Sequence, residues 1–468
     1  MIQTIKFGTD GWRAIIAKEY TFDNLARVVE ATAIWLKTVS DTPSIILGYD
    51  CRFNGKLFAQ HAANVFAQNG VKVFLSHTFA STPMVSLAAF KRQTTAGIII
   101  TASHNPAEYS GYKIKGGYGG PAYPSMIDAV ETAIPDEARI YAENFDTLLN
   151  SKHIEYYDIE ALYINHIKES FDLKAIRASG LKIGYDAMFG AGQHVIRKIL
   201  PDAICIHASF NPSFKGVPPE PIEKNLGVFE DLIRQENIQV GLATDGDADR
   251  IGLYDENANF VDSHHILLLL IDYLVKYKGL TGKVVTTFSC TKKISRLCAH
   301  YNLPHQITKI GFKYICEIML NENVIVGGEE SGGLAVAGHI PERDGIFIGL
   351  TIMELMAKTG KKLTELVQDI YDIVGSFSTG RNDLHLTEEK KQAIIAACKA
   401  GKFTQFGSYK VEATEDLDGF KYHFANDAWM MVRPSGTEPI LRVYAEAADK
   451  AQVADILKQC VAELMKSA

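Results

Sequence analysis

The segment Thr101–Pro106 places a hydroxyl group among residues that form turns. It follows the apolar run Ala96–Ile100, so Ser103 is expected just after the end of a strand. Ligands bind at strand ends in α/β sheets, and a serine beside a histidine and a lysine is a candidate nucleophile. Serine, asparagine and proline after a strand are equally typical of an ordinary turn. This segment alone therefore supports both a catalytic and a structural interpretation.

A loop that follows the apolar run Val240–Ala243 carries three carboxylates at alternate positions, Asp245, Asp247 and Asp249. Alternate residues of an extended loop point to the same side, and like charges gathered there repel unless a cation neutralises them. An acidic turn and a calcium loop between two helices are the alternatives. The calcium loop requires glycine at its sixth position, where this chain has Arg250. The spacing predicts a magnesium site with positions open for water and a phosphate oxygen.

Two further loops combine polar side chains with glycine. Gly327–Gly333 follows another apolar run, and its paired carboxylates can accept hydrogen bonds from neighbouring sugar hydroxyls. Arg433–Glu438 offers a guanidinium, hydroxyls and free backbone amides, which together can bind a phosphate. Arg442, on the strand-like segment that follows, can add a second guanidinium. Each of these loops, taken alone, is also compatible with a turn that binds nothing.

The four loops together resemble the α-D-phosphohexomutase superfamily, which includes phosphoglucomutase and phosphomannomutase. All four motifs occur in the family's order and at comparable spacing, and the opening segment Phe7–Arg13 is also similar. The resemblance implies that Ser103 is the phosphoserine. It also implies that Mg²⁺ is held by Ser103 with Asp245, Asp247 and Asp249.

The resemblance further implies which residues surround the phosphoserine and which contact the substrate. Arg13, His104 and Lys113 match positions around the phosphoserine, with Lys113 in the place of a proposed general base or acid. The expected substrate contacts are Arg250, Lys309, Gly311, Glu329, Ser331, His339, Arg343, Arg433, Ser435, Gly436, Thr437 and Arg442. Among these, Glu329 and Ser331 read the sugar, whereas the loop that begins at Arg433 grips its phosphate.

Departures from the family pattern concern the sugar. Some bacterial members carry histidine where this chain has Gly333, whereas the segment His339–Gly345 is similar to that of phosphoglucomutases. His339 and Arg343 are therefore expected to supply the polar contacts, and Lys309 stands where threonine is frequent. These differences leave the preference between glucose and mannose open, and we expect phosphates of both sugars to be turned over.

The activity that the resemblance implies is movement of phosphate between O1 and O6 of α-D-hexose phosphates. Phosphate would pass through the phosphoserine and a hexose 1,6-bisphosphate, which serves as intermediate or activator. A hexose 1,6-bisphosphate synthase that uses the same serine is the main alternative. A metal-dependent phosphatase usually needs more than one metal, and one ligand cluster is visible. A non-catalytic sugar-phosphate sensor would not need Ser103, the three aspartates and Lys113.

Composition describes an ordinary globular protein. Hydrophobic residues make up 47% and the net charge is −7, which excludes a generally basic nucleic-acid-binding surface but allows local binding of sugar phosphates. The apolar run Ile266–Ile271 is too short for a membrane span, and the first residues lack a secretion signal. Seven cysteines without a Cys-x-x-Cys motif indicate reduced thiols. We expect a cytoplasmic monomer or homodimer whose partners are small-molecule sugar phosphates.

A strand, a turn and a helix recur three times along the chain, beginning at Ser44, Leu181 and Lys283. This recurrence predicts three similar mixed α/β domains, followed by a smaller C-terminal α+β domain. Polar or glycine-containing segments place the predicted domains at residues 1–150, 151–258, 259–375 and 376–468. Each domain contributes one of the four loops, so the loops are expected to converge on a central cleft.

Overall fold

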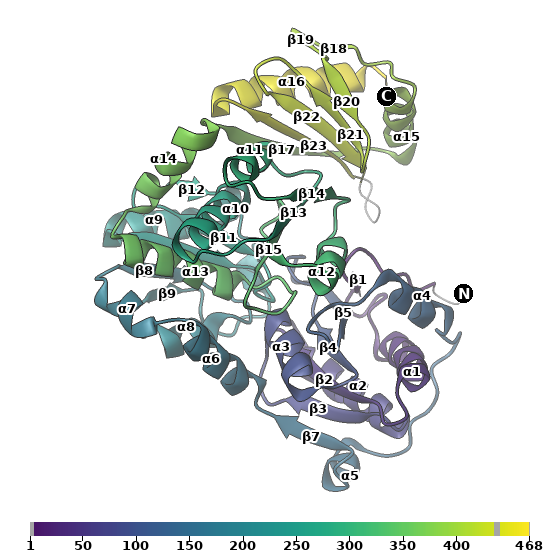
Figure 1. Ribbon diagram of the computed structural model, residues 1–468. Coiled ribbons are helices and arrows are strands. Elements are labelled where there is room, and N and C mark those ends of the chain that lie inside the picture. Colours follow the sequence, from purple (N-terminus) through teal and green to yellow (C-terminus); the bar gives the residue numbers. More distant parts are fainter. Residues whose placement is uncertain (1–3, 435–439, 468) are drawn as a thin grey trace. The chain divides into compact units, whose positions relative to one another are not determined.

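The structure, a computed structural model, describes residues 4–434 and 440–467 (Figure 1). Its elements form three similar mixed α/β domains and a smaller C-terminal domain, as the sequence predicts. By compactness the chain divides into two units. The first unit contains residues 1–285 and 311–367, and the second contains residues 286–310 and 368–468.

The first sheet has the strand order β1-β5-β4-β2-β3-β7, with β6 beside β5. β2 is parallel to β3 and β4, whereas β5 is antiparallel to β4 and β1. Its strands are β1 (Trp12–Ile15), β2 (Ser44–Tyr49), β3 (Lys72–Ser76), β4 (Ala96–Ile100), β5 (Tyr109–Gly116), β6 (Gly120–Pro121) and β7 (Ile154–Tyr157). The inner strands are apolar throughout because helices cover both faces of the sheet.

The helices of this domain are α1 (Phe22–Val39), α2 (Gly55–Gln68), α3 (Thr82–Arg92), α4 (Pro124–Thr132) and α5 (Phe145–Asn150). Apolar side chains of α1 and α2 fill the core beneath one face of the sheet, and α3 lies on the other side (Figure 1). Side chains fix where helices begin: Thr21 accepts a hydrogen bond from the backbone of Asn24, and Ser81 from that of Met84.

The second sheet has the order β12-β11-β10-β8-β9. Its strands are β8 (Ile183–Asp186), β9 (Ile204–Ile206), β10 (Val240–Thr244), β11 (Ile251–Tyr254) and β12 (Phe260–Val261). The accompanying helices are α6 (Ile159–Ser170), α7 (Leu173–Ala178), α8 (Gln193–Ile199), α9 (Gly227–Glu236) and the single turns η1 (Phe214–Gly216) and η2 (Glu223–Asn225). β10 and β11 are antiparallel, and the loop that carries Asp245, Asp247 and Asp249, here called the acidic loop, joins them.

The third sheet has the order β14-β13-β15-β16. Its strands are β13 (Lys283–Thr287), β14 (His305–Thr308), β15 (Val324–Gly328) and β16 (Leu334–Val336). Its helices are α10 (Ser263–Asp272), η3 (Tyr273–Tyr277), α11 (Lys293–His300), α12 (Phe312–Asn321), α13 (Gly345–Thr359) and α14 (Leu363–Val374). The limit between the two units falls within β13 and within α14.

The C-terminal domain has an antiparallel sheet of order β17-β23-β22-β21-β20 and a separate pair, β18-β19. Its strands are β17 (Ser378–His385), β18 (Gln405–Phe406), β19 (Tyr409–Lys410), β20 (Ala413–Glu415), β21 (Phe420–His423), β22 (Trp429–Pro434) and β23 (Ile440–Ala447). Helices α15 (Glu388–Lys399) and α16 (Lys450–Met465) contribute apolar side chains to its core.

The three predicted repeats are confirmed as β2-α2-β3, β8-α8-β9 and β13-α11-β14. Each repeat has the predicted order because an apolar strand ends in a polar turn that starts a helix. Among the described residues, no helix combines the length and apolar character that crossing a membrane requires. The apolar run Ile266–Ile271 lies within α10 and is buried.

Candidate functional site

Ser103 lies in the loop that leaves β4, at the position predicted from the sequence. Its backbone φ of 52° falls in the left-handed region, which a residue other than glycine adopts only where its surroundings enforce it. The side chain is buried, with 1% of the residue exposed. Its Oγ donates a 2.7 Å hydrogen bond to Asp245 Oδ2 and lies 3.5 Å from His104 Nδ1. The candidate nucleophile thus contacts the acidic loop directly.

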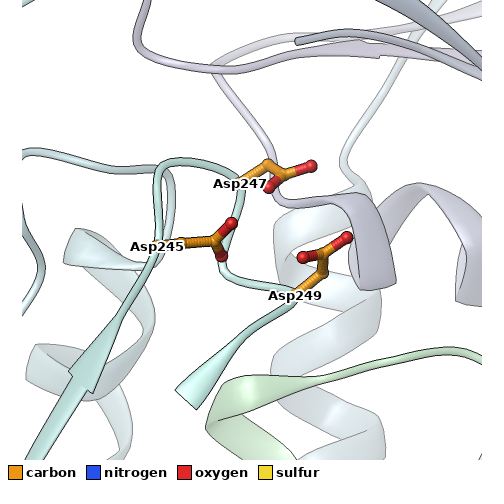
Figure 2. Close-up of side chains that lie close together, drawn as sticks. All are labelled: Asp245, Asp247 and Asp249. Atoms are coloured by element: carbon orange, nitrogen blue, oxygen red, sulfur yellow. The ribbon is translucent and has the colours of Figure 1, made fainter. Parts of the chain in front are cut away.

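The three aspartates lie together on the loop between β10 and β11, all fully buried. One carboxylate oxygen from each residue lies within 4.8 Å of the others, and Figure 2 shows the three side chains close together. Strands flank this loop, so the helix-flanked calcium motif is excluded. A Cβ atom at Gly246 would clash with the carbonyl oxygen of Ser103. The backbone of the acidic loop therefore contacts the backbone of the loop between β4 and β5, which carries Ser103 and is here called the serine loop.

Two cations share the carboxylates of this cluster. Lys113 Nζ lies 2.7 Å from Asp247 Oδ2, 3.1 Å from Asp249 Oδ2 and 2.8 Å from Asp10 Oδ2. Arg343 pairs with Asp10 and with Asp249, the latter at 2.6 Å. Lys113 comes from β5, directly opposite Ile99 of β4, so the register of these strands carries it to the serine loop.

Burial and charge act in opposite directions on the acids and bases here. Burial raises the pKa of Asp245 well above its ordinary value, and the carboxylates of Asp247 and Asp249 raise it further. Burial alone would lower the pKa of Lys113, but the surrounding carboxylates outweigh burial and raise it. Burial lowers the pKa of His104 well below its ordinary value, and nearby Arg and Lys side chains act in the same direction.

The acidic cluster fits a divalent cation. Asp247 Oδ1 and Asp249 Oδ1 are buried and have no hydrogen-bond partner among the residues described. Buried polar atoms without a partner are rare in folded proteins, and a bound cation would satisfy both of these oxygens. Carboxylate oxygens are the donors that Mg²⁺ prefers. The geometry of the triad is therefore that of a candidate metal site.

Arg13 and Glu329 also lie in this cluster. The Nη1 atom of Arg13 donates a 2.7 Å hydrogen bond to Asn105 Oδ1 in the serine loop. Glu329 follows β15, and its Oε2 lies 3.7 Å from Arg343 Nη1. Burial raises the pKa of Glu329 to about 7, against the effect of that guanidinium. The structure thus brings together loops from all three sheets of the α/β domains.

Other predicted residues have different surroundings. Arg250 donates its backbone N–H to Asp245 Oδ1, while its guanidinium lies 3.8 Å from Glu220. Ser331 is half-buried in the turn that follows Glu329. Gly311 precedes α12, and a Cβ atom there would lie 3.2 Å from the side chain of Thr9.

His339 is not brought to the serine. Its Nε2 lies 3.0 Å from Asp344 Oδ2 and its Nδ1 lies 3.0 Å from His166 Nε2, while its ring stacks on Phe347 at 4.0 Å. Its side chain is 1% exposed. These contacts anchor the segment that carries Arg343, and they describe a structural role for this histidine.

The second unit contains a pair of arginines. Arg433 on β22 lies directly opposite Arg442 on β23, and the Nε atoms of both are buried without a hydrogen-bond partner in the described chain. Like charges opposite each other destabilise a sheet unless an anion lies between them. Asp418 Oδ1 lies 3.4 Å from Arg433 Nε. The same side chain accepts a hydrogen bond from the backbone N–H of Ile310, the neighbour of the predicted substrate contact Lys309.

Lys309, a predicted substrate contact next to Ile310, is exposed. The remaining predicted phosphate contacts, Ser435, Gly436 and Thr437, lie outside the described residues.

Sequence reasoning missed several residues of the cluster. Asp10 forms ion pairs with both Lys113 and Arg343. Thr82 donates a 2.5 Å hydrogen bond to Asp247, and Lys115 Nζ lies 2.9 Å from Glu342 Oε2. The side chain of Arg52 is fully buried and donates a hydrogen bond to the backbone carbonyl of Ser103. A signal existed for Arg52, since it follows the apolar strand β2 just as Ser103 follows β4.

Comparison with known proteins identifies the family. Models of the phosphoglucomutase/phosphomannomutase family match the chain in order: α/β/α domain I at residues 4–140, domain II at 161–258, domain III at 262–374 and the C-terminal domain at 386–463. These matches cover most of the sequence.

Relatives carry more than one substrate name. A "Phosphoglucomutase/phosphomannomutase" of Thermococcus kodakarensis is 29% identical over 461 residues, covering 97% of this chain and 96% of that protein. A "Phosphoglucosamine mutase" of Carboxydothermus hydrogenoformans is 29% identical over 467 residues, covering 98% and 99%. The crystal structure of a "putative phosphomannomutase" from Thermus thermophilus is 31% identical, covers 100% of both chains and has a TM-score of 0.87. The chain belongs to the α-D-phosphohexomutase superfamily.

Proposed function

We propose that this protein moves phosphate between O1 and O6 of α-D-hexose phosphates, with Ser103 as the residue that carries the phosphoryl group. The observation that carries the proposal is the hydrogen bond of 2.7 Å between Ser103 Oγ and Asp245, inside a buried cluster of carboxylates and cations. A serine in an ordinary turn would not need this surrounding. The relatives described above are all named as mutases, which agrees with the proposal.

Phosphoryl transfer exchanges one phosphorus–oxygen bond for another. The bond between phosphorus and Ser103 Oγ breaks, a bond to a sugar hydroxyl oxygen forms, and the hydroxyl gives up its proton. His104, whose Nδ1 lies 3.5 Å from Ser103 Oγ, is the group beside the serine that can accept this proton. Lys113, which the surrounding carboxylates keep protonated, is assigned the role of acid in the same cluster. The product is a hexose 1,6-bisphosphate. Return of its other phosphate to Ser103 completes the isomerisation.

Asp245, Asp247 and Asp249, together with Ser103 or the phosphate on it, would hold one Mg²⁺. When bound, the cation supplies positive charge that stabilises the negative oxygens of the transferring phosphoryl group. The guanidinium of Arg343 and the ammonium of Lys113 contribute fixed positive charge from the protein itself.

The arginine pair of the C-terminal domain is assigned to the phosphate that is not reacting. Arg433 and Arg442 present two guanidiniums from neighbouring strands, and Ser435, Gly436 and Thr437 belong to the same assigned set. Charge-assisted hydrogen bonds from guanidinium to phosphate are strong and directional. Glu329 and Ser331 are assigned to the sugar hydroxyls, and Arg250 and Gly311 to substrate contacts nearby.

Product analysis tests this proposal. The purified protein is incubated with the 1-phosphates of glucose, mannose and glucosamine, each with and without the corresponding 1,6-bisphosphate, and products are identified by phosphorus NMR. We expect 6-phosphates of glucose and mannose, formed faster with bisphosphate. Accumulation of bisphosphate would identify a synthase, release of inorganic phosphate a phosphatase, and turnover of glucosamine phosphate alone would exclude the proposed substrates.

A further inference from the structure

A closed ring of contacts holds the backbone of Ser103 on both sides. The Ser103 N–H donates a 2.9 Å hydrogen bond to Thr101 Oγ1, and the Thr101 hydroxyl donates one of 2.5 Å to Asp50 Oδ2. The same Asp50 oxygen lies 3.2 Å from Arg52 Nε, and Arg52 Nη2 donates a 2.7 Å hydrogen bond to the Ser103 carbonyl. Three side chains therefore fix both polar groups of the serine backbone.

Arg52 also binds the rest of the serine loop. Its Nη1 donates to the carbonyls of Pro106 and Tyr109 at 2.7 and 2.9 Å, and its Nη2 donates to that of Asn105 at 2.6 Å. The side chain is completely buried. A guanidinium is planar and carries several donors in a fixed arrangement, so one side chain can bind four carbonyls at once. A lysine ammonium at this position could not reproduce that arrangement.

We propose that Arg52 positions Ser103 for phosphoryl transfer, an inference that rests on the function proposed above. Ser103 has the left-handed backbone that directs its Oγ to Asp245, and the ring of contacts is what enforces this conformation. A misplacement of about 1 Å in a reacting group can slow a reaction on the order of 100-fold. Arg52 contacts the main chain and not the reacting atoms, so it is a positioning residue.

The test measures the uptake of phosphate by Ser103 in a single turnover. Wild type and Arg52→Ala are mixed with glucose 1,6-bisphosphate, and phosphorylated protein is followed by intact-mass analysis. We expect the variant to be slower by about 100-fold. Guanidinium ion, added at a concentration that leaves the protein folded, should restore at least part of the rate by occupying the space left by the side chain. Arg52→Lys should remain slow because an ammonium lacks the planar set of donors.

A matched control separates positioning from general stability. Arg27 on α1 is also a buried arginine of this domain, and its Nε donates a 2.7 Å hydrogen bond to the carbonyl of Pro135. Arg27→Ala should be phosphorylated at nearly the wild-type rate, and guanidinium should not change that rate. Equal slowing in Arg27→Ala and Arg52→Ala would show a general loss of stability and would overturn the inference.

Thr101→Val opens the same ring at another point and tests the inference even where Arg52→Ala does not fold. Valine has the shape of threonine but no hydroxyl, so the Ser103 N–H and Asp50 both lose a partner. We expect phosphorylation about 10-fold slower. A wild-type rate in Thr101→Val and in Arg52→Ala would overturn the positioning role while leaving the proposed function intact. Wild type that takes up no phosphate would overturn the proposed function itself.

Discussion

Ser103 and Asp245 lie 142 positions apart in the chain, yet the Oγ of the serine donates a hydrogen bond directly to the aspartate. They follow strands of two different sheets, β4 and β10. A phosphorylated serine has no hydroxyl hydrogen, so this bond can exist only in the free-serine form. Phosphorylation of Ser103 would therefore free Oδ2 of Asp245 for another partner, while Oδ1 would keep its hydrogen bond from the Arg250 N–H.

Replacing Ser103 with alanine should lower turnover of hexose phosphates by at least about 1000-fold, because the residue that carries the phosphoryl group is lost. Intact-mass analysis after incubation with a bisphosphate should show one phosphate on wild type and none on the variant. Ser76, a buried serine at the end of β3, provides the control, and Ser76→Ala should react normally. Near-normal turnover by Ser103→Ala would exclude a phosphoserine mechanism.

Asp247→Asn should raise the Mg²⁺ concentration needed for half-maximal activity by roughly 10-fold or more, because one anionic ligand of three is lost. Activity is measured against Mg²⁺ concentration, with metal binding followed separately by calorimetry. Asp255 is a buried carboxylate of the same domain that accepts hydrogen bonds from Asn257 and Asn259, and Asp255→Asn should leave the metal requirement unchanged. If chelation of all divalent metal leaves wild type fully active, the metal assignment is wrong.

Arg433→Ala should reduce kcat/KM for hexose phosphates roughly 30- to 1000-fold, which corresponds to about 2–4 kcal/mol for one charge-assisted phosphate contact. Mg²⁺ binding and the slow hydrolysis of the phosphoserine should be nearly unaffected. Arg381, on β17 of the same domain, pairs with Asp383, and Arg381→Ala serves as the control with a kcat/KM close to wild type. A variant that loses Mg²⁺ binding but keeps its affinity for sugar phosphate would contradict this division of roles.

Glu446 on β23 should make stability depend on pH. It is 1% exposed, and burial raises its pKa to about 7 in spite of Thr291, Lys421 and Lys293, which act to lower it. The folded protein therefore keeps this proton up to about pH 7, whereas the unfolded chain releases it near its ordinary value of 4.5. The contribution of Glu446 to stability is fully present below about pH 4.5 and is lost as the pH rises through about 7.

Glu446→Gln cannot ionise, so it should gain stability relative to wild type between about pH 5 and pH 8, by up to about 3 kcal/mol. Thermal unfolding midpoints of both proteins at the two pH values provide the measurement. Glu412, an exposed glutamate of the same domain, gives the control, and Glu412→Gln should show no such change with pH. A difference between Glu446→Gln and wild type that stays constant with pH would contradict the assignment.

The strand-end loops could be predicted because their signal is local. An apolar run followed by polar turn residues marks Ser103, Asp245 and Glu329 without knowledge of the fold. The strand, turn and helix predicted from Ser44 onward are found as β2 followed by α2 (Gly55–Gln68). The domain boundaries near residues 150, 258 and 375 stay a prediction.

Contacts that depend on strand order could not be predicted. Asp10 precedes β1 and pairs with Lys113 because β1 lies beside β5, which no local pattern in the sequence indicates. Its pairing with Arg343, from the segment before α13, depends on how two domains pack. The contact of His339 with His166 joins residues 173 positions apart, and only the fold shows that the two rings meet, while a sugar contact of His339 stays a prediction. The position of Arg52 after β2 is a local signal, but its hydrogen bonds to four backbone carbonyls between Ser103 and Tyr109 depend on the fold and could not be predicted.

The close approach of Gly246 to the Ser103 carbonyl restricts which amino-acid substitutions this site can accept. Most distances in an active site can be adjusted by exchanging one side chain for another, but here the opposing atom belongs to the main chain. Any side chain at position 246 would act as a wedge between the serine and the three aspartates. The spacing between Ser103 and the three carboxylates is therefore set by how the backbones of the two loops pack, and changing it requires that the loops themselves move.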